Sequence, residues 1–532
     1  MFINSRKLLP LPIITFLVFL ILLVACSQAD NRMPTRKTKA APTSTDAAAS
    51  TTKFPSLTPT HPATSTPTAT PEPVSLIDVD PGDLENVNIR FWHAWTGPVE
   101  QVMNEIVAQF NKENEWGIQV QAESQGTLDQ LYENVQAGIS ENKPPDLSIG
   151  YLYQALDWDA EQELVNLNDY VDDPIWGLTD NEQADYYEVF WEHDIDGERR
   201  VGFPIQRYGQ MLYYNVSWAY ELGFTAAPTT VEEFREQACA AAQANLEDEY
   251  PENDGTGGWI VSTDYSAILG WLYAFGADIA PAIDNDPENS AQESVYDFHN
   301  PQVEDAFTFL RELYDEGCAW IADSQYPDNE FADRLGLFAA GTLSGIPYQA
   351  DTFQQTDNDD QWTVIPYPSS EGKPVISIYG PSLVMFPSTE PEQLAAWMFI
   401  KWLTKPENQV RMIEKTGSIP LDATTLVLVE TIDGIQPQWS ASIKQLQTTA
   451  LAGVSEPGYQ SWRIVRWAVS DAATQLFRYY FTIDKVPELV KFLHQTANDL
   501  HEDALKDSSI KISTPTPDTT RTPESTQASP KP

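Results

Sequence analysis

Strands and helices alternate along residues 87–150, and this alternation constrains the fold more than any other feature of the sequence. A strand pattern over 87–91 leads through Trp92, His93 and Trp95 into a helix that can begin at Pro98, because the first helical residue needs no N–H. Further strand patterns over 117–124 and 145–150 flank an apolar repeat of helical spacing. The spacing predicts an α/β fold with a largely parallel sheet and helices on both of its faces.

Polar and aromatic side chains follow the first and third of these strands. The carboxyl ends of parallel strands lie along one edge, where open α/β sheets bind ligands, so we expect these side chains to form one wall of a cleft. Aromatic faces suit the C–H faces of a sugar, and imidazole and hydroxyl groups suit its hydroxyls. A strand-end tryptophan can also pack beneath a helix. The predicted contacts are His93, Trp95, Thr96, Tyr151 and Tyr153.

The chain is strongly acidic. Its 532 residues carry a formal net charge of −47, which argues against a nucleic-acid partner and against a basic membrane-binding face. The cysteines and histidines show no metal-ligand spacing, and the acidic runs at 284–288 and 357–360 lack the pattern of a calcium-binding loop. We predict no metal and no cofactor. Cys239 and Cys318 are compatible with a disulfide and equally with two separate buried thiols.

Residues 1–26 form a targeting segment rather than part of the fold. Arg6 and Lys7 precede an apolar run over 8–24, and the segment ends in Leu-Val-Ala-Cys at Cys26, which resembles a bacterial lipoprotein signal. This resemblance implies cleavage before Cys26 and lipidation of its thiol with a diacylglyceryl group. The apolar run is also nearly long enough for an uncleaved transmembrane anchor. Both alternatives place the mature protein on the extracytoplasmic face of the bacterial cell membrane and tethered to it.

Two segments have compositions that cannot form a hydrophobic core. Residues 27–83 are dominated by Ser, Thr, Pro and Ala with repeated Thr-Pro steps, and the C-terminal residues 508–532 have a similar character. We predict that the first is a disordered stalk that holds a globular module away from the membrane, and that the second is a disordered tail.

Several motifs follow one another between the stalk and the tail. They include F-W-H-A-W-T-G (91–97), F-P-I-Q-R-Y-G-Q-M-L-Y-Y-N (203–215), F-A-A-G-T (338–342), K-W-L-T-K-P-E-N-Q (401–409) and K-T-G-S-I-P (415–420). In this order, from about Val87 to Lys506, they resemble the extracellular solute-binding proteins of ABC importers, in the family 1, carbohydrate-binding group.

The resemblance implies a two-lobed, periplasmic-binding-protein-like fold of type II, in which hinge strands join two α/β lobes and the ligand lies between them. The chain would cross between the lobes at 202–215 and again at 362–368. Lobe one would comprise 84–203 plus 367–420, and lobe two 208–362 plus 421–507.

The same resemblance implies ligand contacts in the hinge and in lobe two. Arg207 can instead pair with a carboxylate, and Arg463 can be a charge on the lobe surface. The turn at 379–382 matches the family's G-G-x-S turn only in part, because tyrosine replaces the first glycine. The implied contacts are Arg207, Tyr208, Tyr265, Trp271, Tyr348, Tyr379, Gly380, Trp462 and Arg463.

Two late helices carry capping signals that serve stability rather than ligand binding. Thr389 and Glu392 form a T-x-x-E capping box, and Thr404 with Glu407 repeats the pattern. Gly417 can end the second helix with a positive φ.

The leading functional hypothesis is a monomeric binding protein, not an enzyme, that captures a sugar or oligosaccharide and delivers it to ABC permease subunits. A cell-surface glycoside hydrolase is the alternative, because aromatic subsites and carboxylates would serve it equally. A ligand-binding subunit of a surface sensor is a third option. Arg207 and Arg463 favour an anionic ligand such as a sugar phosphate, whereas the aromatic residues favour a neutral sugar, so the sequence leaves the charge of the solute open.

Overall fold

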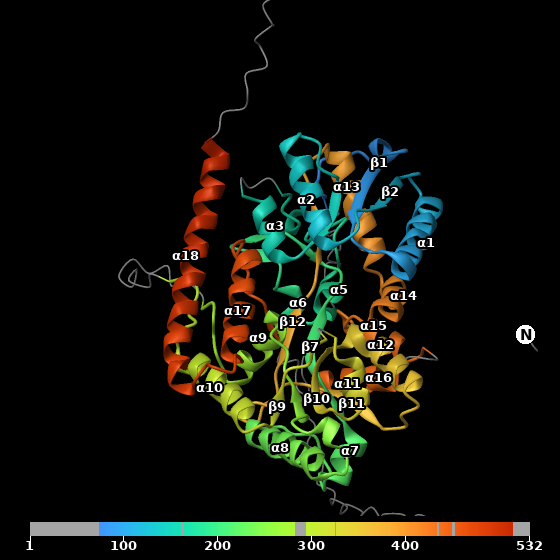
Figure 1. Cartoon of the computed structure of the whole chain (residues 1–532). Coiled ribbons are helices and arrows are strands. Elements are labelled where there is room, and N and C mark those ends of the chain that lie inside the picture. The colour runs from blue at the N-terminus through green and yellow to red at the C-terminus, as the bar shows by residue number, and fades with distance from the viewer. Residues whose placement is uncertain are drawn as a thin grey trace, which may run out of the picture. The chain divides into compact units, whose positions relative to one another are not determined.

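The computed structural model in Figure 1 describes residues 74–160, 164–281, 294–324, 326–432, 436–448 and 453–513. The predicted signal segment with Cys26, the stalk before residue 74, the acidic run at 284–288 and the tail beyond residue 513 lie outside the described residues. Of the helices within the described ranges, none combines the length and apolar character needed to span a bilayer.

The first sheet contains the strands that the sequence predicts around residues 87–150. Strand β1 (Asn88–His93) lies between β2 (Gln119–Ser124) and β3 (Leu147–Gly150) and pairs with both in parallel. Two later strands complete this sheet, because β13 (Ser382–Met385) pairs antiparallel with β3 and with β6 (Phe203–Pro204). The predicted parallel core of the sheet is therefore confirmed, with antiparallel strands added on one side.

Helices from two distant parts of the chain cover the first sheet. Figure 1 shows α13 and α14, in orange, beside α1 and β1, in blue. Phe91 of β1 packs against Phe399 of α13, and Phe399 also contacts Phe110 of α1. Both segments bury apolar faces here, so neither forms this core alone. The longer helices of this lobe are α1 (Gly97–Glu113), α2 (Leu128–Ser140), α3 (Leu152–Trp158), α13 (Glu390–Leu403) and α14 (Pro406–Thr416). Its short helices are α4 (Asn168–Val171), α5 (Asp180–Asp185) and α6 (Glu188–Trp191), and a separate hairpin is formed by β4 (Ile195–Asp196) and β5 (Arg199–Arg200).

The second sheet is built around the long strand β7 (Tyr208–Asn215), which is buried along almost its whole length. Strands on both sides pair with β7 antiparallel, and the outer pairs are parallel. The sheet is thus mixed. Its other strands are β8 (Gly257–Ile260), β9 (Ala319–Trp320), β10 (Gly336–Thr342), β11 (Trp362–Ile365), β12 (Ile376–Tyr379) and β14 (Gly453–Ser455).

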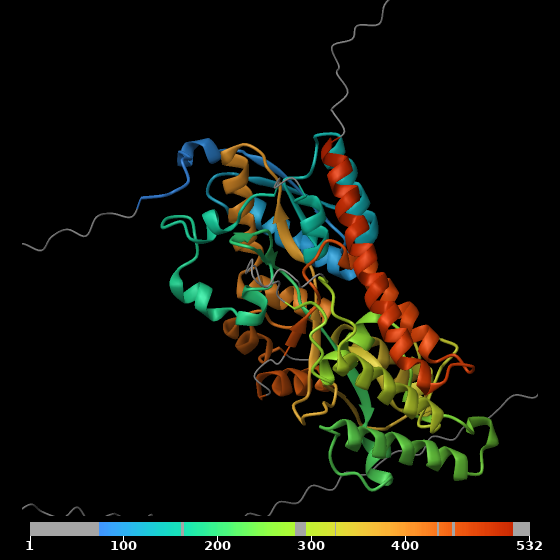
Figure 2. The same cartoon turned by 90° about the vertical axis from the view of Figure 1, so that its left-hand side faces the viewer.

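Large aromatic side chains fill the core between the second sheet and its helices. Trp271 is fully buried and packs against Phe234, Trp259 and Tyr367. Figures 1 and 2 show the C-terminal helix α18, in red, running along this lobe. The helices are α7 (Val216–Glu221), α8 (Val231–Glu247), α9 (Tyr265–Ala274), α10 (Pro301–Asp315), α11 (Asp328–Ala332), α12 (Ile346–Gln355), α15 (Ala423–Val429), α16 (Pro437–Thr448), α17 (Trp462–Leu476) and α18 (Val486–Ser513).

The chain crosses between the two sheets at short extended segments. The first crossing joins β6 to β7 through residues 205–207, within the predicted range. The second crossing joins β12 to β13 at Gly380–Pro381, so the predicted crossing at 362–368 is wrong. Strand β11 instead pairs with β7 in the second sheet, and Tyr367 bridges to Val375, which keeps the chain in lobe two.

The folded part of the chain includes residues that the sequence assigns to the stalk. The Ser75 hydroxyl and the Leu76 N–H donate to Asp173 Oδ2 over 2.8 and 2.6 Å, and Ile77 and Val79 pack against the first core. Because these contacts hold residues 75–79 on lobe one, the predicted boundary at residue 83 is too late.

The two capping predictions have different outcomes. Thr389 and Glu392 form the predicted capping box at the start of α13, and Gly417 ends α14 at a φ of 65°. The predicted box of Thr404 with Glu407 is wrong. Thr404 ends α13 and its hydroxyl donates back to Ile400 O over 2.8 Å, while Lys405 is the residue before α14.

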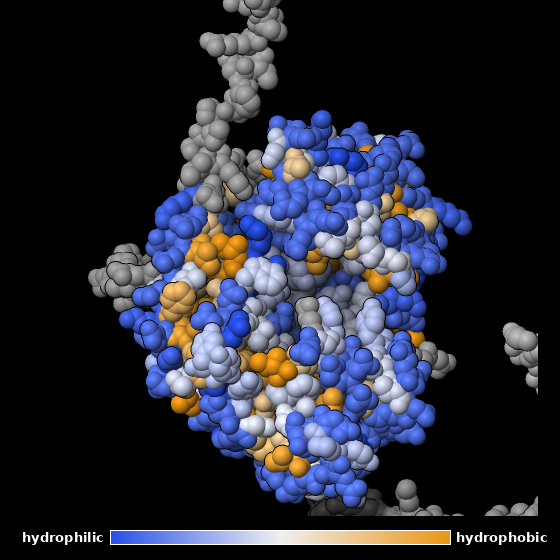
Figure 3. Space-filling view, in the orientation of Figure 1, coloured by the Kyte–Doolittle hydropathy of each residue, from blue (hydrophilic) through white to orange (hydrophobic). Residues whose placement is uncertain are grey.

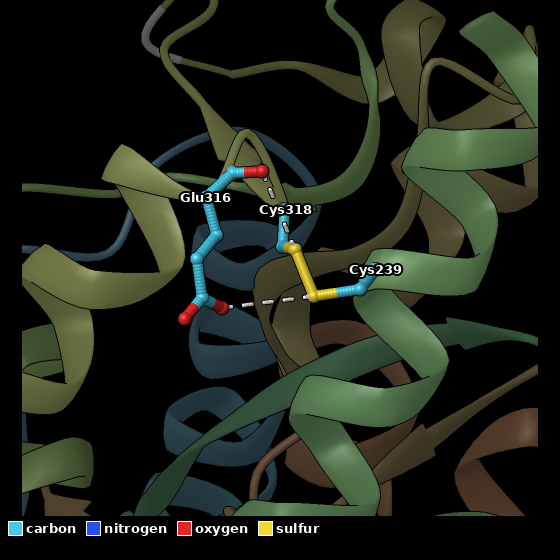
Figure 4. A group of neighbouring side chains, drawn as sticks. All are labelled: Cys239, Glu316 and Cys318. Atoms are coloured by element: carbon cyan, nitrogen blue, oxygen red, sulfur yellow. Dashed lines mark hydrogen bonds between the residues drawn. A yellow bond between two sulfur atoms is a disulfide. The ribbon is translucent and has the colours of Figure 1, made fainter.

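Cys239 and Cys318 form a disulfide that ties α8 to the residue before β9, which settles the alternatives left by the sequence (Figure 4). The Glu316 carboxylate lies 4.0 Å from Cys239 Sγ and accepts from Arg235. Although these three residues converge, both sulfur atoms are committed to the S–S bond, so the group is a structural link rather than a metal site.

The face of the molecule seen in Figure 3 is mostly hydrophilic, in keeping with the acidic composition.

Candidate ligand-binding site between the two lobes

The crossing segments are held together by a buried polar network around Arg207. Its Nη1 donates to the backbone oxygens of Gln206 and Pro381 at 2.9 Å, and its Nη2 donates to Asp194 Oδ2 at 2.7 Å and to Ser382 Oγ at 2.9 Å. Burial alone would raise the pKa of Asp194, but the Arg207 guanidinium and the neighbouring hydrogen bonds hold it well below its usual range. The network thus joins both crossings through a buried ion pair, and the Arg207 Nε has no hydrogen-bond partner among the described residues.

This network corrects two predicted ligand contacts. The Arg207 side chain is 0% exposed, and its charge pairs with Asp194 rather than facing a ligand. Gly380 is buried at the second crossing with a φ of 149°, and a Cβ there would lie 2.3 Å from Gln206 O. Both residues therefore shape the hinge, and the alternative of a carboxylate partner for Arg207 is the correct one.

The end of β1, predicted as the first wall of the site, is sealed. His93 is 1% exposed and its ring lies 5.2 Å from that of Trp95, which is 8% exposed. The Trp95 indole N–H donates to Gln206 Oε1 over 2.9 Å and so connects β1 to the first crossing. Burial lowers the pKa of His93 to about 4, so its imidazole is neutral at pH 7. Thr96 is exposed as the residue before α1.

Five tyrosines from both lobes lie where the lobes meet, and we call them the tyrosine cluster: Tyr151, Tyr153, Tyr208, Tyr265 and Tyr379. The rings of Tyr151 and Tyr153 stack at 5.3 Å with an interplanar angle of 6°, and those of Tyr208 and Tyr379 lie 5.7 Å apart. Burial raises the pKa of Tyr151 and Tyr379 well above the usual range, and the nearby Glu456 carboxylate raises each of them further. Tyr153 is buried, whereas the other four tyrosines, all predicted contacts, are partly exposed.

Arg466 of α17 links the cluster across the lobes. Its Nη1 donates to the hydroxyl of Tyr153 in lobe one and to that of Tyr265 in lobe two, the second over 3.3 Å. Its guanidinium lies 4.9 Å and 5.2 Å from the centres of these two rings, in cation–π contact with each. The sequence singled out Arg463 and missed Arg466, although the two are one helical turn apart.

Glu456 is the carboxylate beside the cluster. It follows β14, where its N–H donates to Ile378 O over 3.2 Å, and its side chain is 9% exposed. Its Oε2 accepts from the Trp462 indole over 3.2 Å, but its Oε1 has no hydrogen-bond partner within the described part of the chain. Burial raises the pKa of Glu456 to about 7, against the effects of Trp462 and Arg466.

A cavity of about 340 Å³ lies between the lobes, with Glu456 in its wall. Helix α3 and residues 189–196 form the side of lobe one, and the loop after β14 forms the side of lobe two. Gly458 permits the close approach, because a Cβ there would lie 2.9 Å from Leu152 Cδ2. The lining residues are Leu152, Leu156, Val189, Glu192, His193, Ile195, Asp196, Ser455, Glu456 and Gly458.

The remaining predicted contacts lie elsewhere. Trp271 is a core residue at 0% exposure, and Tyr348 is 69% exposed on α12. Trp462 is also 0% exposed, so it positions Glu456 instead of contacting a ligand. Arg463 lies with its Cζ 5.1 Å from the ring centre of Tyr132 on α2, which makes it a contact between the lobes at the rim.

The sequence carries only a weak signal for Glu456, which is its position at the end of a strand. It comes directly after the short strand Gly453–Ser455, in the same position relative to its strand as Tyr151 has relative to β3. That strand is only three residues long and two of them are polar or glycine, so its pattern is too weak to identify without its neighbour β12.

Comparison with known proteins places the chain in a family. The description "bacterial extracellular solute-binding protein" fits residues 105–484, and the chain therefore belongs to this family of binding proteins, which act outside the cytoplasm. Among curated proteins no match is found.

Solved structures with the same two-lobed fold cover most of the chain. The cyclic α-maltosyl-1,6-maltose binding protein of Arthrobacter globiformis is 18% identical, with a TM-score of 0.62 over 79% of this chain and 100% of that chain. The sugar-binding protein MalE of Xanthomonas citri is 18% identical, with a TM-score of 0.65 over 81% and 100%. UgpB of Mycobacterium tuberculosis, solved with glycerophosphocholine, is 16% identical, with a TM-score of 0.58 over 77% and 98%. At these identities the likeness shows the fold.

Proposed function

We propose that the protein captures a sugar or oligosaccharide between its lobes and delivers it to an ABC-type permease. The observation that carries this proposal is the meeting of partly exposed tyrosines from both lobes beside Glu456, a buried carboxylate that lines a cavity between the lobes. Tyrosine rings offer apolar faces to the C–H groups of a sugar, and Glu456 Oε1 accepts from a hydroxyl.

Binding is coupled to lobe closure in this proposal. A ligand that touches Tyr151 in lobe one and Tyr265 or Tyr379 in lobe two stabilises the arrangement in which the lobes meet. The crossings at 205–207 and 380–381 are the hinge, as in the hinge closure described for periplasmic binding proteins. Arg207 keeps the crossings together while the lobes move. The permease then distinguishes the ligand-bound form by the relative position of the lobes.

The proposal includes a tether. The Leu-Val-Ala-Cys sequence that ends at Cys26 supports lipidation of this residue, and the residues up to 73 supply a stalk. A monomer at the end of such a stalk stays near its permease on the extracytoplasmic face of the membrane while its binding site samples the medium.

The structural relatives support a sugar as the solute. The protein of Arthrobacter globiformis is described as binding a cyclic maltosyl-maltose, and that of Xanthomonas citri as sugar-binding. The glycerophosphocholine in UgpB shows that this fold also accepts a phosphodiester, so the fold alone does not decide the charge of the ligand.

A thermal-shift screen of the full chain in detergent against maltose, maltotriose and other neutral and phosphorylated sugars tests the proposal. A sugar at 100 times its dissociation constant should add about 2.7 kcal/mol to the free energy of unfolding. We expect a hit to be recovered intact, and Tyr379→Ala to weaken it. Conversion of the hit into smaller sugars would favour the glycoside hydrolase instead, and the absence of stabilisation by every sugar would contradict the proposal.

A further inference from the structure

The cavity between the lobes is acidic. Three of its lining side chains are carboxylates, Glu192, Asp196 and Glu456, and within the described part of the chain no Lys or Arg lines it. The lining imidazole, that of His193, has its Nδ1 2.9 Å from Asp194 Oδ1. A ligand in this cavity therefore meets an excess of negative charge, whatever its shape.

The nearby arginines are committed to groups of the protein. Arg207 pairs with Asp194 at the hinge, and Arg463 lies over Tyr132 at the rim. Arg466 lies among the rings of Tyr153 and Tyr265, where its charge acts on Glu456. Its Nε has no hydrogen-bond partner among the described residues, but Arg466 is not among the residues that line the cavity. One positive charge that is balanced by Glu456 does not compensate the other two carboxylates.

Glu456 lacks one hydrogen bond. Its carboxylate is nine-tenths buried, and only Oε2 is bonded within the described residues. A buried acceptor without a partner costs free energy, and a ligand that donates to Oε1 removes this cost. A hydroxyl or an ammonium group can donate to it. Above pH 7, where Glu456 is ionised, a phosphate or carboxylate group would place a second anion beside Glu456 and be repelled.

We propose that this site selects sugars that bring hydroxyl or ammonium donors to Glu456 and excludes anionic sugars such as sugar phosphates and sugar acids. This inference rests on the proposed sugar-binding function. It decides whether the solute is neutral or anionic, which neither the sequence nor the fold decides. In the sequence, the aromatic residues favour a neutral sugar and the arginines favour an anionic one. The selecting residue is Glu456, together with the acidic cavity wall at Glu192 and Asp196.

The test is a titration calorimetry series at pH 8, above the raised pKa of Glu456, on the full chain with three matched ligands: maltotriose, maltotriose with one 6-phosphate, and maltotriose with one 6-amino group. We expect the amino form to bind at least as tightly as the neutral sugar and the phosphate to bind at least tenfold more weakly. Equal or tighter binding of the phosphate would overturn the inference. Equal weakening of the amino and phosphate forms would also overturn it, because size rather than charge would then decide.

Single-residue variants test which side chains weaken the binding of the phosphorylated sugar. Glu456→Gln keeps the size of the side chain and removes its charge, so the penalty on the phosphate should shrink at least threefold. Asp196→Asn, in the same cavity wall, provides a second variant if Glu456→Gln does not fold. Glu113→Gln, at an exposed position of α1, is the matched control and should leave the penalty unchanged. If Glu113→Gln reduced the loss of affinity caused by the phosphate equally, that loss would arise from the net charge of the whole protein, and the proposed role of Glu456 would be overturned.

The same series separates this inference from the proposed function. Failure of every sugar, neutral and charged, to bind contradicts sugar capture itself. Binding of phosphorylated sugars without their neutral forms contradicts only the exclusion of anions and leaves sugar capture in place.

Discussion

Two regions of the molecule present buried polar and aromatic groups, the end of β1 and the segment 453–467, and they differ in what these groups face. At the end of β1, His93 and Trp95 are sealed within lobe one, and the Trp95 indole is bonded to the hinge. In the segment 453–467, Glu456 and Arg466 are almost as buried, but one lines a cavity and the other touches both lobes. Several aromatic residues at the end of a strand therefore indicate a hydrophobic core as readily as a binding site. The two cases differ in whether the residues contact the opposite lobe or a cavity beside it.

The hinge should show the largest effect. Arg207→Met should lower the free energy of unfolding by about 3–5 kcal/mol, because it leaves the Asp194 carboxylate buried without its partner. Urea denaturation measures this loss, and Arg463→Met, at the rim, should cost less than about 1 kcal/mol. If Arg207→Met kept its stability and lost only ligand affinity, Arg207 would be the ligand contact that the sequence predicts.

Acidification should affect the two regions in opposite directions. His93 has its pKa lowered from 6.5 to about 4 by burial, so its contribution to stability is complete above pH 6.5 and is lost as the pH falls toward 4. Glu456 has its pKa raised from 4.5 to about 7 by burial, with Trp462, Arg466 and Asp264 as the neighbouring groups that modify it. The contribution of the neutral Glu456 carboxyl to the free energy of unfolding is complete below pH 4.5 and is lost as the pH rises toward 7.

Denaturation of His93→Phe and Glu456→Gln between pH 4 and pH 7.5 measures these contributions. Each shift corresponds to a few kcal/mol of stability, on the order of 1.4 kcal/mol per pKa unit. Relative to that protein, His93→Phe should gain stability as the pH falls, and Glu456→Gln should gain stability as the pH rises. If the stability of both variants changed in the same direction with pH, then His93 would not be a buried neutral imidazole or Glu456 would not be a buried carboxyl with a raised pKa.

Ligand affinity should depend on the tyrosine cluster and not on the end of β1. Tyr379→Ala should weaken binding of the sugar identified in the screen by about 10- to 100-fold, as expected when an aromatic anchor is removed. His93→Phe should change affinity less than twofold, because its ring is sealed from the cavity. Titration calorimetry decides between them, and a larger loss with His93→Phe would restore the site predicted at β1.

The contact at the rim should show the smallest effect. Arg463→Ala removes a cation–π contact between α17 and Tyr132 of α2, which is present only when the lobes meet. A contact of this kind contributes about 0.5–1 kcal/mol, so ligand affinity should fall roughly two- to fivefold with little change in the stability of the free protein. A loss above 50-fold would indicate that Arg463 binds the ligand directly.

Local patterns predict the elements of this fold well and its connections less well. The strands around β1–β3, the helix at Pro98 and the capping box at Thr389 follow from periodicity and from neighbouring residues. The second crossing was misplaced because β11 and β12 both pair with β7, a contact between distant segments that periodicity does not encode.

The site shows the same limit. Four of the predicted tyrosines, Tyr151, Tyr208, Tyr265 and Tyr379, are brought together half-buried, whereas Trp271 and Trp462 are core residues of the same chemical type. Residue type alone cannot separate these two fates, because the difference arises from which face the other lobe covers. Glu456 and Arg466 were missed for the same reason, since each gains its significance from a partner more than 70 residues away in lobe one or the second sheet.

The most direct test of sugar binding between the lobes is a crystal structure of the protein in complex with maltotriose, or with whichever sugar in the screen stabilises the protein most. We predict that the sugar lies between α3 and the loop after β14, with its ring faces on Tyr151, Tyr265 or Tyr379 and a hydroxyl donating to Glu456 Oε1. A sugar bound against His93 and Trp95 at the end of β1, or on one lobe alone, would contradict it.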